Sequence, residues 1–237
     1  MIKIEHVVGP SPDQMEFIIE GMRNPLNSWA KTDSEIHQTP VSEGRKDELY
    51  LGDNDKDLMG RLRDAGTDHR KFMRMMPIFV RVTAPLYWWK EFDTYKIGTV
   101  SNSCSTMHKI QAKEFTLYDF STDRLFDTCL LERVINELNI YRDIYNNYDA
   151  QTAEYKAEFS KKEIWWQMIQ LLPSTYNQTR NISMNYETMY NIWHARNNHK
   201  LDEWQKFCDF MSIELPYSWL FCEWKSRLVN TSSKGEK

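Results

Sequence analysis

The chain has 237 residues, of which 41% are hydrophobic and 27% charged, and its formal net charge at pH 7 is −4. This composition is typical of a globular protein with a sizeable core, and the weak negative charge excludes a global basic field that would attract nucleic acid or a membrane. The eight glycines form no dinucleotide-binding or P-loop motif, which argues against a glycine-rich phosphate loop.

The cysteines and the N-terminus indicate the compartment. The four cysteines form no zinc-binding pattern, so we expect free thiols and no metal site; they are Cys104, Cys129, Cys208 and Cys222. The N-terminal segment Met1–Val8 is too short and too charged for a signal peptide. No apolar run approaches membrane-spanning length. The sequence therefore predicts a cytoplasmic protein.

The first half of the chain predicts two strands separated by helices. Residues 2–8 alternate as in a strand, and the turn that follows offers an N-cap for a helix through Met22. The polar residues 33–56 predict a surface loop, and residues 55–65 predict a short helix. The clearest strand is Pro77–Pro85, in which the apolar side chains that point one way are Ile78, Val80, Val82 and Ala84.

A hydroxyl-rich run lies between this strand and the second half of the chain. Pro85 is expected at the first position of a helix, as is typical of proline. The run Thr99–Thr106 follows, and its hydroxyls either bind a phosphate or base edge or satisfy the backbone of their own turn.

The second half predicts mostly helix. Residues 123–148 form an amphipathic pattern whose apolar stripe indicates a core or a subunit interface, and residues 151–159 predict a continuation or a short second helix. Ser160 and Glu163 form a capping box for the next helix, which Pro173 ends. The last amphipathic segment starts at Pro216 and contains Trp219, Leu220 and Trp224.

The segment Leu172–Arg196 carries the most informative spacing. We expect a short polar crossing after Pro173, then a helix capped by Asn181 or Ser183 that runs to about Phe210. Asn185 and Arg196 are eleven residues apart, about three turns, which predicts one helical face. Arg196 pairs either with a carboxylate of its own chain or with an anion or carbonyl of a ligand.

These elements predict an α+β fold with a small, mainly antiparallel sheet flanked by several helices. We expect a single domain over residues 1–229 and a flexible polar tail over residues 230–237.

Three segments, in the same order, resemble the family of flavin-dependent thymidylate synthases. They are Gly66–His69, Val82–Tyr87, and Leu172-Pro173 followed by Asn185, Asn191 and Arg196. The resemblance implies that His69 lies near a flavin, that the two asparagines contact it, and that Arg196 contacts a pyrimidine nucleotide.

The chain departs from the family at the signature motif. The family has Arg-His-Arg, then Glu, Ser and Arg at alternate positions; this chain has Thr94-Tyr95-Lys96, then Asn102, Cys104 and Thr106. Ile169 stands where the family has an arginine before Leu-Pro. Two cations that contact the nucleotide in the family are therefore absent from the matching positions.

The resemblance implies a set of site residues. Arg196 is the expected catalytic residue and polarises a carbonyl. Those expected to bind FAD are His69, Asn185, Asn191, Tyr95 and Lys96. Those expected to bind substrate, with Arg196, are Asn102, Ser103, Cys104 and Ser105.

Structural roles compete with several of these assignments. Lys96 and the serine hydroxyls would capture phosphate. Cys104 is expected to be a small buried filler rather than a nucleophile. His69 alternatively caps or bridges backbone, and the two asparagines alternatively bond within a helix-packing interface.

The implied activity is the reductive methylation of dUMP to dTMP with FAD, methylenetetrahydrofolate and NADPH, in a homotetramer with shared sites. No membrane or nucleic-acid partner is expected. Asn102 both donates and accepts hydrogen bonds where the family's carboxylate only accepts, so a different base, as in dCMP, is an alternative. A non-catalytic binding or assembly protein on the same fold is another.

Overall fold

The computed structural model describes residues 1–41 and 44–222, which divide into two compact units. Unit 1 comprises Met1–Lys3, Val82–Thr94 and Asn102–Asn181. Unit 2 comprises the described residues of Ile4–Arg81, Tyr95–Ser101 and Ile182–Lys237. The single domain over residues 1–229 stays a prediction, and the polar tail predicted at 230–237 lies outside the described residues.

One antiparallel sheet of four strands has the strand order β1-β4-β6-β5. The strands are β1 (Lys3–Val8), β4 (Pro77–Pro85), β5 (Val100–Ser103) and β6 (Asn177–Asn185). The predicted bounds of β4 are confirmed, and its alternation too: four side chains of one face are buried, namely Ile78, Val80, Val82 and Ala84. The predicted α+β class is therefore confirmed.

Strand β6 shows that the predicted polar crossing after Pro173 is wrong. Its residues hydrogen-bond to neighbouring strands β4 and β5. Ile182 and Met184 are buried at alternate positions, but polar residues around them conceal the period of two. The following helix is capped by Asn185, and not by Asn181 or Ser183.

Unit 2 holds five α-helices among its described residues. They are α1 (Pro12–Arg23), α2 (Asp53–Asp64), α3 (Lys71–Met75), α8 (Tyr186–Arg196) and α9 (Asp202–Glu214). Their buried side chains include Met15, Met59, Phe72, Met189 and Phe207. The predicted continuous helix to about Phe210 is wrong, because the chain turns between α8 and α9, where Leu201 has extended backbone at the N-cap of α9.

The hairpin β2 (Glu35–Val41) and β3 (Gly44–Tyr50) replaces most of the predicted surface loop. The two strands pair antiparallel, with Ile36 opposite Leu49. Most side chains at the described positions are exposed and polar, so this pairing rests on the backbone ladder and leaves no hydrophobic alternation in the sequence.

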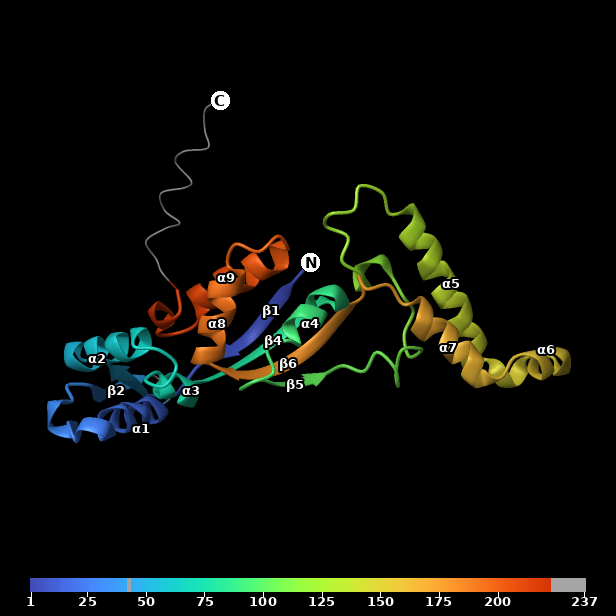
Figure 1. Cartoon of the computed structure of the whole chain (residues 1–237). Helices are drawn as coiled ribbons and strands as arrows, with labels where there is room; N and C mark the ends of the chain where they lie inside the picture. The colour runs from blue at the N-terminus through green and yellow to red at the C-terminus, as the bar shows by residue number, and fades with distance from the viewer. Residues whose placement is uncertain (42–43, 223–237) are drawn as a thin grey trace, which may run out of the picture. The chain divides into compact units, whose positions relative to one another are not determined.

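Unit 1 contains four α-helices: α4 (Leu86–Phe92), α5 (Cys129–Asn146), α6 (Ala153–Glu158) and α7 (Lys161–Leu171). Helices α5 and α7 lie side by side (Figure 1) and bury a shared cluster that includes Leu131, Leu138 and Met168. The predicted amphipathic stripe is therefore core. Helix α5 begins later than predicted, at Cys129, whose N–H donates to the Asp127 carboxylate at 2.9 Å.

Two helix starts in unit 1 test the expected caps. The capping box is confirmed at α7, where the Ser160 N–H donates to Glu163 at 2.7 Å and the Glu163 N–H donates to the Ser160 hydroxyl at 3.3 Å. Pro85 is the N-cap of α4 rather than its first residue. The buried Trp89 of α4 donates its indole N–H to the Gln178 carbonyl on β6 at 2.9 Å, which fixes this helix to the strand.

Short 3₁₀ helices complete the described chain: η1 (Asn24–Leu26), η2 (Trp29–Lys31), η3 (Leu117–Asp119), η4 (Tyr148–Ala150) and η5 (Ser218–Leu220). Helix η5 lies in the predicted last segment and buries Leu220, whereas Trp224 lies outside the described residues. Over residues 1–41 and 44–222, no helix combines the length and the apolar character that crossing a bilayer requires.

Candidate functional site

Arg196, the expected catalytic residue, lies in an aromatic cluster of unit 2. Its Nε donates to the Tyr95 hydroxyl at 2.9 Å. The guanidinium carbon is 5.0 Å from the centre of the Trp204 ring and 5.7 Å from that of Tyr95. The two rings meet edge to face. The structure thus brings together two predicted site residues that are far apart in the sequence, and two rings favour the cation.

Asn185 ends β6 and caps α8. Its side-chain oxygen accepts the Thr188 N–H at 2.9 Å, and the Thr188 hydroxyl donates to the Ile97 carbonyl at 3.2 Å. Asn185 has extended backbone, so the expected placement of Asn185 and Arg196 on one helical face is wrong. A cap cannot take part in the helical repeat.

A close backbone approach lies next to this cap. Gly98 has a φ of +71°, in the left-handed region, and a Cβ at this position would lie 2.5 Å from the Asn185 amide nitrogen. Glycine is required here for both reasons.

The other predicted flavin residues of unit 2 are exposed. Lys96 and Asn191 point to the surface. His69 lies in a turn, and its backbone N–H donates to the Gly66 carbonyl at 3.1 Å. Two neighbours of these residues in the sequence, Arg70 and Tyr190, are in contact: the Arg70 guanidinium carbon lies 4.3 Å from the Tyr190 ring centre. The Tyr190 ring also stacks on that of His194, with 4.0 Å between the ring centres. Sequence reasoning missed this stack.

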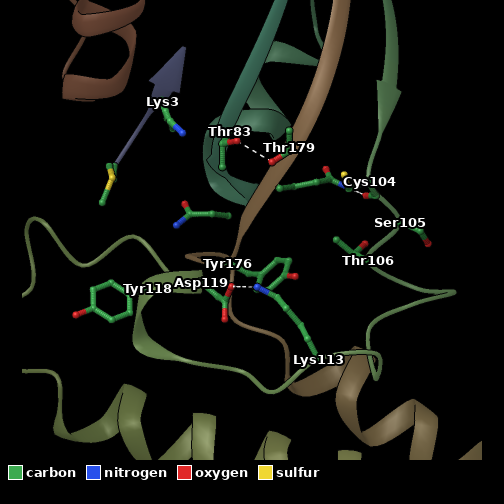
Figure 2. A pocket seen from close by; sticks show the side chains of 13 residues that line it. Lys3, Thr83, Cys104, Ser105, Thr106, Lys113, Tyr118, Asp119, Tyr176 and Thr179 are labelled. Carbon is green, nitrogen blue, oxygen red and sulfur yellow. Dashed lines mark hydrogen bonds and ion pairs between the residues drawn. The ribbon is translucent and has the colours of Figure 1, made fainter. Parts of the chain in front are cut away.

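The substrate residues predicted from the hydroxyl-rich run lie in unit 1, where a cavity of about 390 Å³ opens (Figure 2). Cys104 and Ser105 line it, whereas Asn102 and Ser103 lie on the exposed strand β5 and do not. Other lining side chains come from β4, from β6 and the residue before it, and from the segment between β5 and α5; they include Thr83, Thr106, Lys113, Asp119, Tyr176 and Thr179.

Strand β6 holds the backbone of Cys104 in place. Its N–H donates to the Thr179 carbonyl at 2.9 Å, and its carbonyl accepts the Gln178 side-chain amide at 2.7 Å. The residue is exposed, so the expectation of a buried filler is wrong. The reason is that the chain leaves β5 here and borders the cavity rather than entering the core.

The Ser105 hydroxyl is occupied by its own turn. It accepts the N–H groups of Met107 at 3.1 Å and His108 at 2.8 Å. Of the two interpretations of this run, the turn that satisfies its own backbone therefore applies to Ser105.

An ion pair between Lys113 and Asp119 lies in the cavity. Figure 2 shows the lysine side chain reaching toward the carboxylate beside the Tyr176 ring. The second oxygen of Asp119 accepts the Thr116 N–H at 2.9 Å and its hydroxyl at 3.0 Å, so the carboxylate is fixed. The hydrogen bond that Lys113 donates to the Asp119 carboxylate raises the pKa of Lys113, which stays charged at neutral pH. Burial raises the pKa of Tyr176, which stays a neutral phenol.

Sequence reasoning missed Lys113, Asp119, Tyr176 and Trp204. Thr116 and Asp119 form a capping box, a detectable signal, but one that predicts a helix start and no ligand. Trp204 follows the break after α8, which the predicted continuous helix did not allow for.

No protein-family model and no curated protein sequence matches the chain. Solved structures match its fold. Thymidylate synthase X (ThyX) from Helicobacter pylori, crystallised with FAD and dUMP, has a TM-score of 0.62 at 14% sequence identity, over 93% of this chain and 97% of that chain. A second structure of that enzyme complexed with FAD and dUMP has a TM-score of 0.59 at the same identity and coverage.

A third similar structure is that of an enzyme with a different named activity. The UMP/dUMP methylase PolB from Streptomyces cacaoi, bound with 5-Br dUMP, has a TM-score of 0.51 at 11% identity, over 90% of this chain and 88% of that chain. At these identities the likeness concerns the fold. The chain thus has the fold of flavin-dependent thymidylate synthases, and the resemblance found in the sequence is confirmed at that level.

Proposed function

We propose that the chain is a flavin-dependent methylase that converts dUMP to dTMP, with methylenetetrahydrofolate as carbon donor and NADPH as reductant. The observation that supports this most is the aromatic cluster around Arg196, on a fold that matches ThyX over 93% of the chain. We further propose a cytoplasmic homotetramer with shared sites, as the resemblance implies.

The residues assigned to FAD suit it chemically. Asn191 and His69 expose a carboxamide and an imidazole, which can hydrogen-bond to the polar edge of an isoalloxazine ring. The half-buried Tyr95 ring offers a planar stacking surface. When bound, the flavin supplies the hydride chemistry that protein side chains lack.

The proposed role of Arg196 is to polarise a pyrimidine carbonyl. A guanidinium stays charged at all physiological pH values and presents several fixed N–H donors. The Tyr95 hydroxyl accepts a hydrogen bond from one of these donors at 2.9 Å and thereby orients the guanidinium. A preoriented donor stabilises charge that develops on a carbonyl oxygen, because it needs no reorganisation during the reaction. No protein nucleophile is needed for this role.

Arg196→Ala tests the proposal. The wild-type protein is expected to take up FAD, seen as the visible absorbance of an oxidised flavin, and to form dTMP. The variant should retain FAD and lose dTMP formation by about 100-fold or more, the usual cost of removing a preoriented electrostatic donor. The matched control is Arg61→Ala, which removes an exposed helical arginine paired with Asp57.

Two outcomes contradict the proposal. A wild-type protein without FAD uptake would favour the non-catalytic binding protein, and unchanged turnover in Arg196→Ala would refute the role of that residue.

UMP is a second candidate substrate, favoured by the match to a UMP/dUMP methylase. The same assay with dUMP, UMP and dCMP as competing substrates ranks them by kcat/KM. The dCMP arm tests the alternative base that the sequence leaves open.

A further inference from the structure

The cavity of unit 1 has a cation that the signature motif does not provide. Thr106 stands where the resemblance places an arginine, and Thr106 lines this cavity. Lys113 lines the same cavity from seven residues further along the chain. A positive charge lost at one position is therefore present at another.

The geometry of Lys113 leaves it able to bind an anion. An ammonium group has three N–H donors, and Asp119 occupies one of them. Asp119 itself is held by Thr116, so it fixes the position of the ammonium group at the cavity. Lys3 adds a second ammonium side chain to the lining.

The rest of the lining suits a nucleoside. The Thr83 and Thr179 hydroxyls lie 2.7 Å apart and can donate to or accept from a sugar hydroxyl. The Tyr176 ring offers an aromatic face. A cavity of about 390 Å³ lies within the usual range for small-ligand sites.

We propose that this cavity binds a nucleoside monophosphate and that Lys113 holds its phosphate, in place of the guanidinium that Thr106 lacks. The inference rests on the proposed function, which supplies the class of nucleotide. It assigns the phosphate contact to a residue outside every motif that the sequence displays.

The test compares dUMP with deoxyuridine, which lacks the phosphate, by isothermal titration calorimetry. Lys113→Ala should weaken dUMP binding by about 10- to 100-fold, the usual effect of one charge-assisted hydrogen bond, and leave deoxyuridine binding unchanged. The matched control is Lys109→Ala, an exposed lysine of the same loop that does not line the cavity. It should bind both compounds like the wild type.

Equal dUMP affinity in Lys113→Ala and wild type would overturn the inference, as would equal losses for dUMP and deoxyuridine. A wild-type protein that binds no dUMP would overturn it too, while FAD uptake would still test the flavin part of the proposed function. Binding of dUMP that depends on Lys113, without dTMP formation, would refute the proposed function and support this site.

Discussion

Two acid–base pairs, one in each unit, have similar partners and opposite surroundings. In unit 2, Arg23 and Asp55 have side chains only 4% and 0% exposed, with Nε and Oδ1 at 2.7 Å. In unit 1, Lys113 is 69% exposed and its partner Asp119 14%. The Asp55 carboxylate also accepts hydrogen bonds from the Thr32 hydroxyl at 2.8 Å and the Ser34 hydroxyl at 2.7 Å.

Burial decides what each pair contributes. Every charged group of the unit 2 pair has left water, so the pair stabilises the fold only while both partners are present. In the unit 1 pair the lysine side chain remains mostly exposed, so the pair contributes little stability, which agrees with the ligand contact proposed for Lys113. The following substitutions test this contrast, beginning with the most buried pair.

Asp55→Ala is expected to have the largest effect. The substitution leaves the Arg23 guanidinium buried without its carboxylate, and breaking such a pair costs about 3–5 kcal/mol of unfolding free energy. Urea denaturation measures the difference. Asp57→Ala on the same helix is the control, because Asp57 is exposed and pairs with Arg61 at the surface. Equal stabilities of the two variants would contradict the contrast.

The pH dependence of the unfolding free energy provides a second control for Asp55→Ala. Burial alone would raise the pKa of Asp55, but hydrogen bonds from Ser34 and Thr32 lower it below its ordinary value. The folded state then binds fewer protons than the unfolded state. Its stabilisation is present above the unfolded pKa of about 3.9 and is lost as pH falls through the lower folded pKa. The gap between wild type and Asp55→Ala should therefore shrink below about pH 4.

The parts of the fold that could be predicted are those in which burial leaves a period in the sequence. Strand β4 and helix α5 bury every second residue and one helical stripe, respectively, and both were predictable. The hairpin β2–β3 has mostly exposed side chains, so backbone pairing forms it without such a period. Helix α9 begins after Leu201, whose backbone is extended, and no hydrophobic period in the sequence marks this break.

The residues of the candidate site also divide into those that the sequence could predict and those that it could not. The resemblance named both Tyr95 and Arg196, but no spacing could show that they touch across 101 residues. Cys104 was named as a substrate residue and lines a cavity, although as an exposed rather than a buried side chain. Lys113 and Tyr176 were not predictable, because only the folded loop brings them to the same cavity.

Arg74→Ala probes a pair of intermediate burial. Arg74 is 40% exposed and Glu187 14%, and the arginine also donates to the Thr67 carbonyl at 2.5 Å. It thereby connects α3 to α8 and to the turn that carries His69. We expect a loss of about 1–2 kcal/mol in urea denaturation, between the values for the buried and the exposed pair. A loss of unfolding free energy as large as that of Asp55→Ala would show that the exposure of a pair does not determine how much it stabilises the fold.

Lys113→Ala should change the unfolding free energy least, by less than about 1 kcal/mol, because a mostly solvated ammonium gains little from its partner. Urea denaturation of this variant beside Lys109→Ala measures the effect at low and high salt. A small change in stability would show that the variant is still folded. A loss of dUMP affinity in the binding experiment would then reflect a lost ligand contact rather than unfolding. A loss above about 2 kcal/mol would instead make Lys113 a structural residue like Asp55 and remove the distinction between the two pairs.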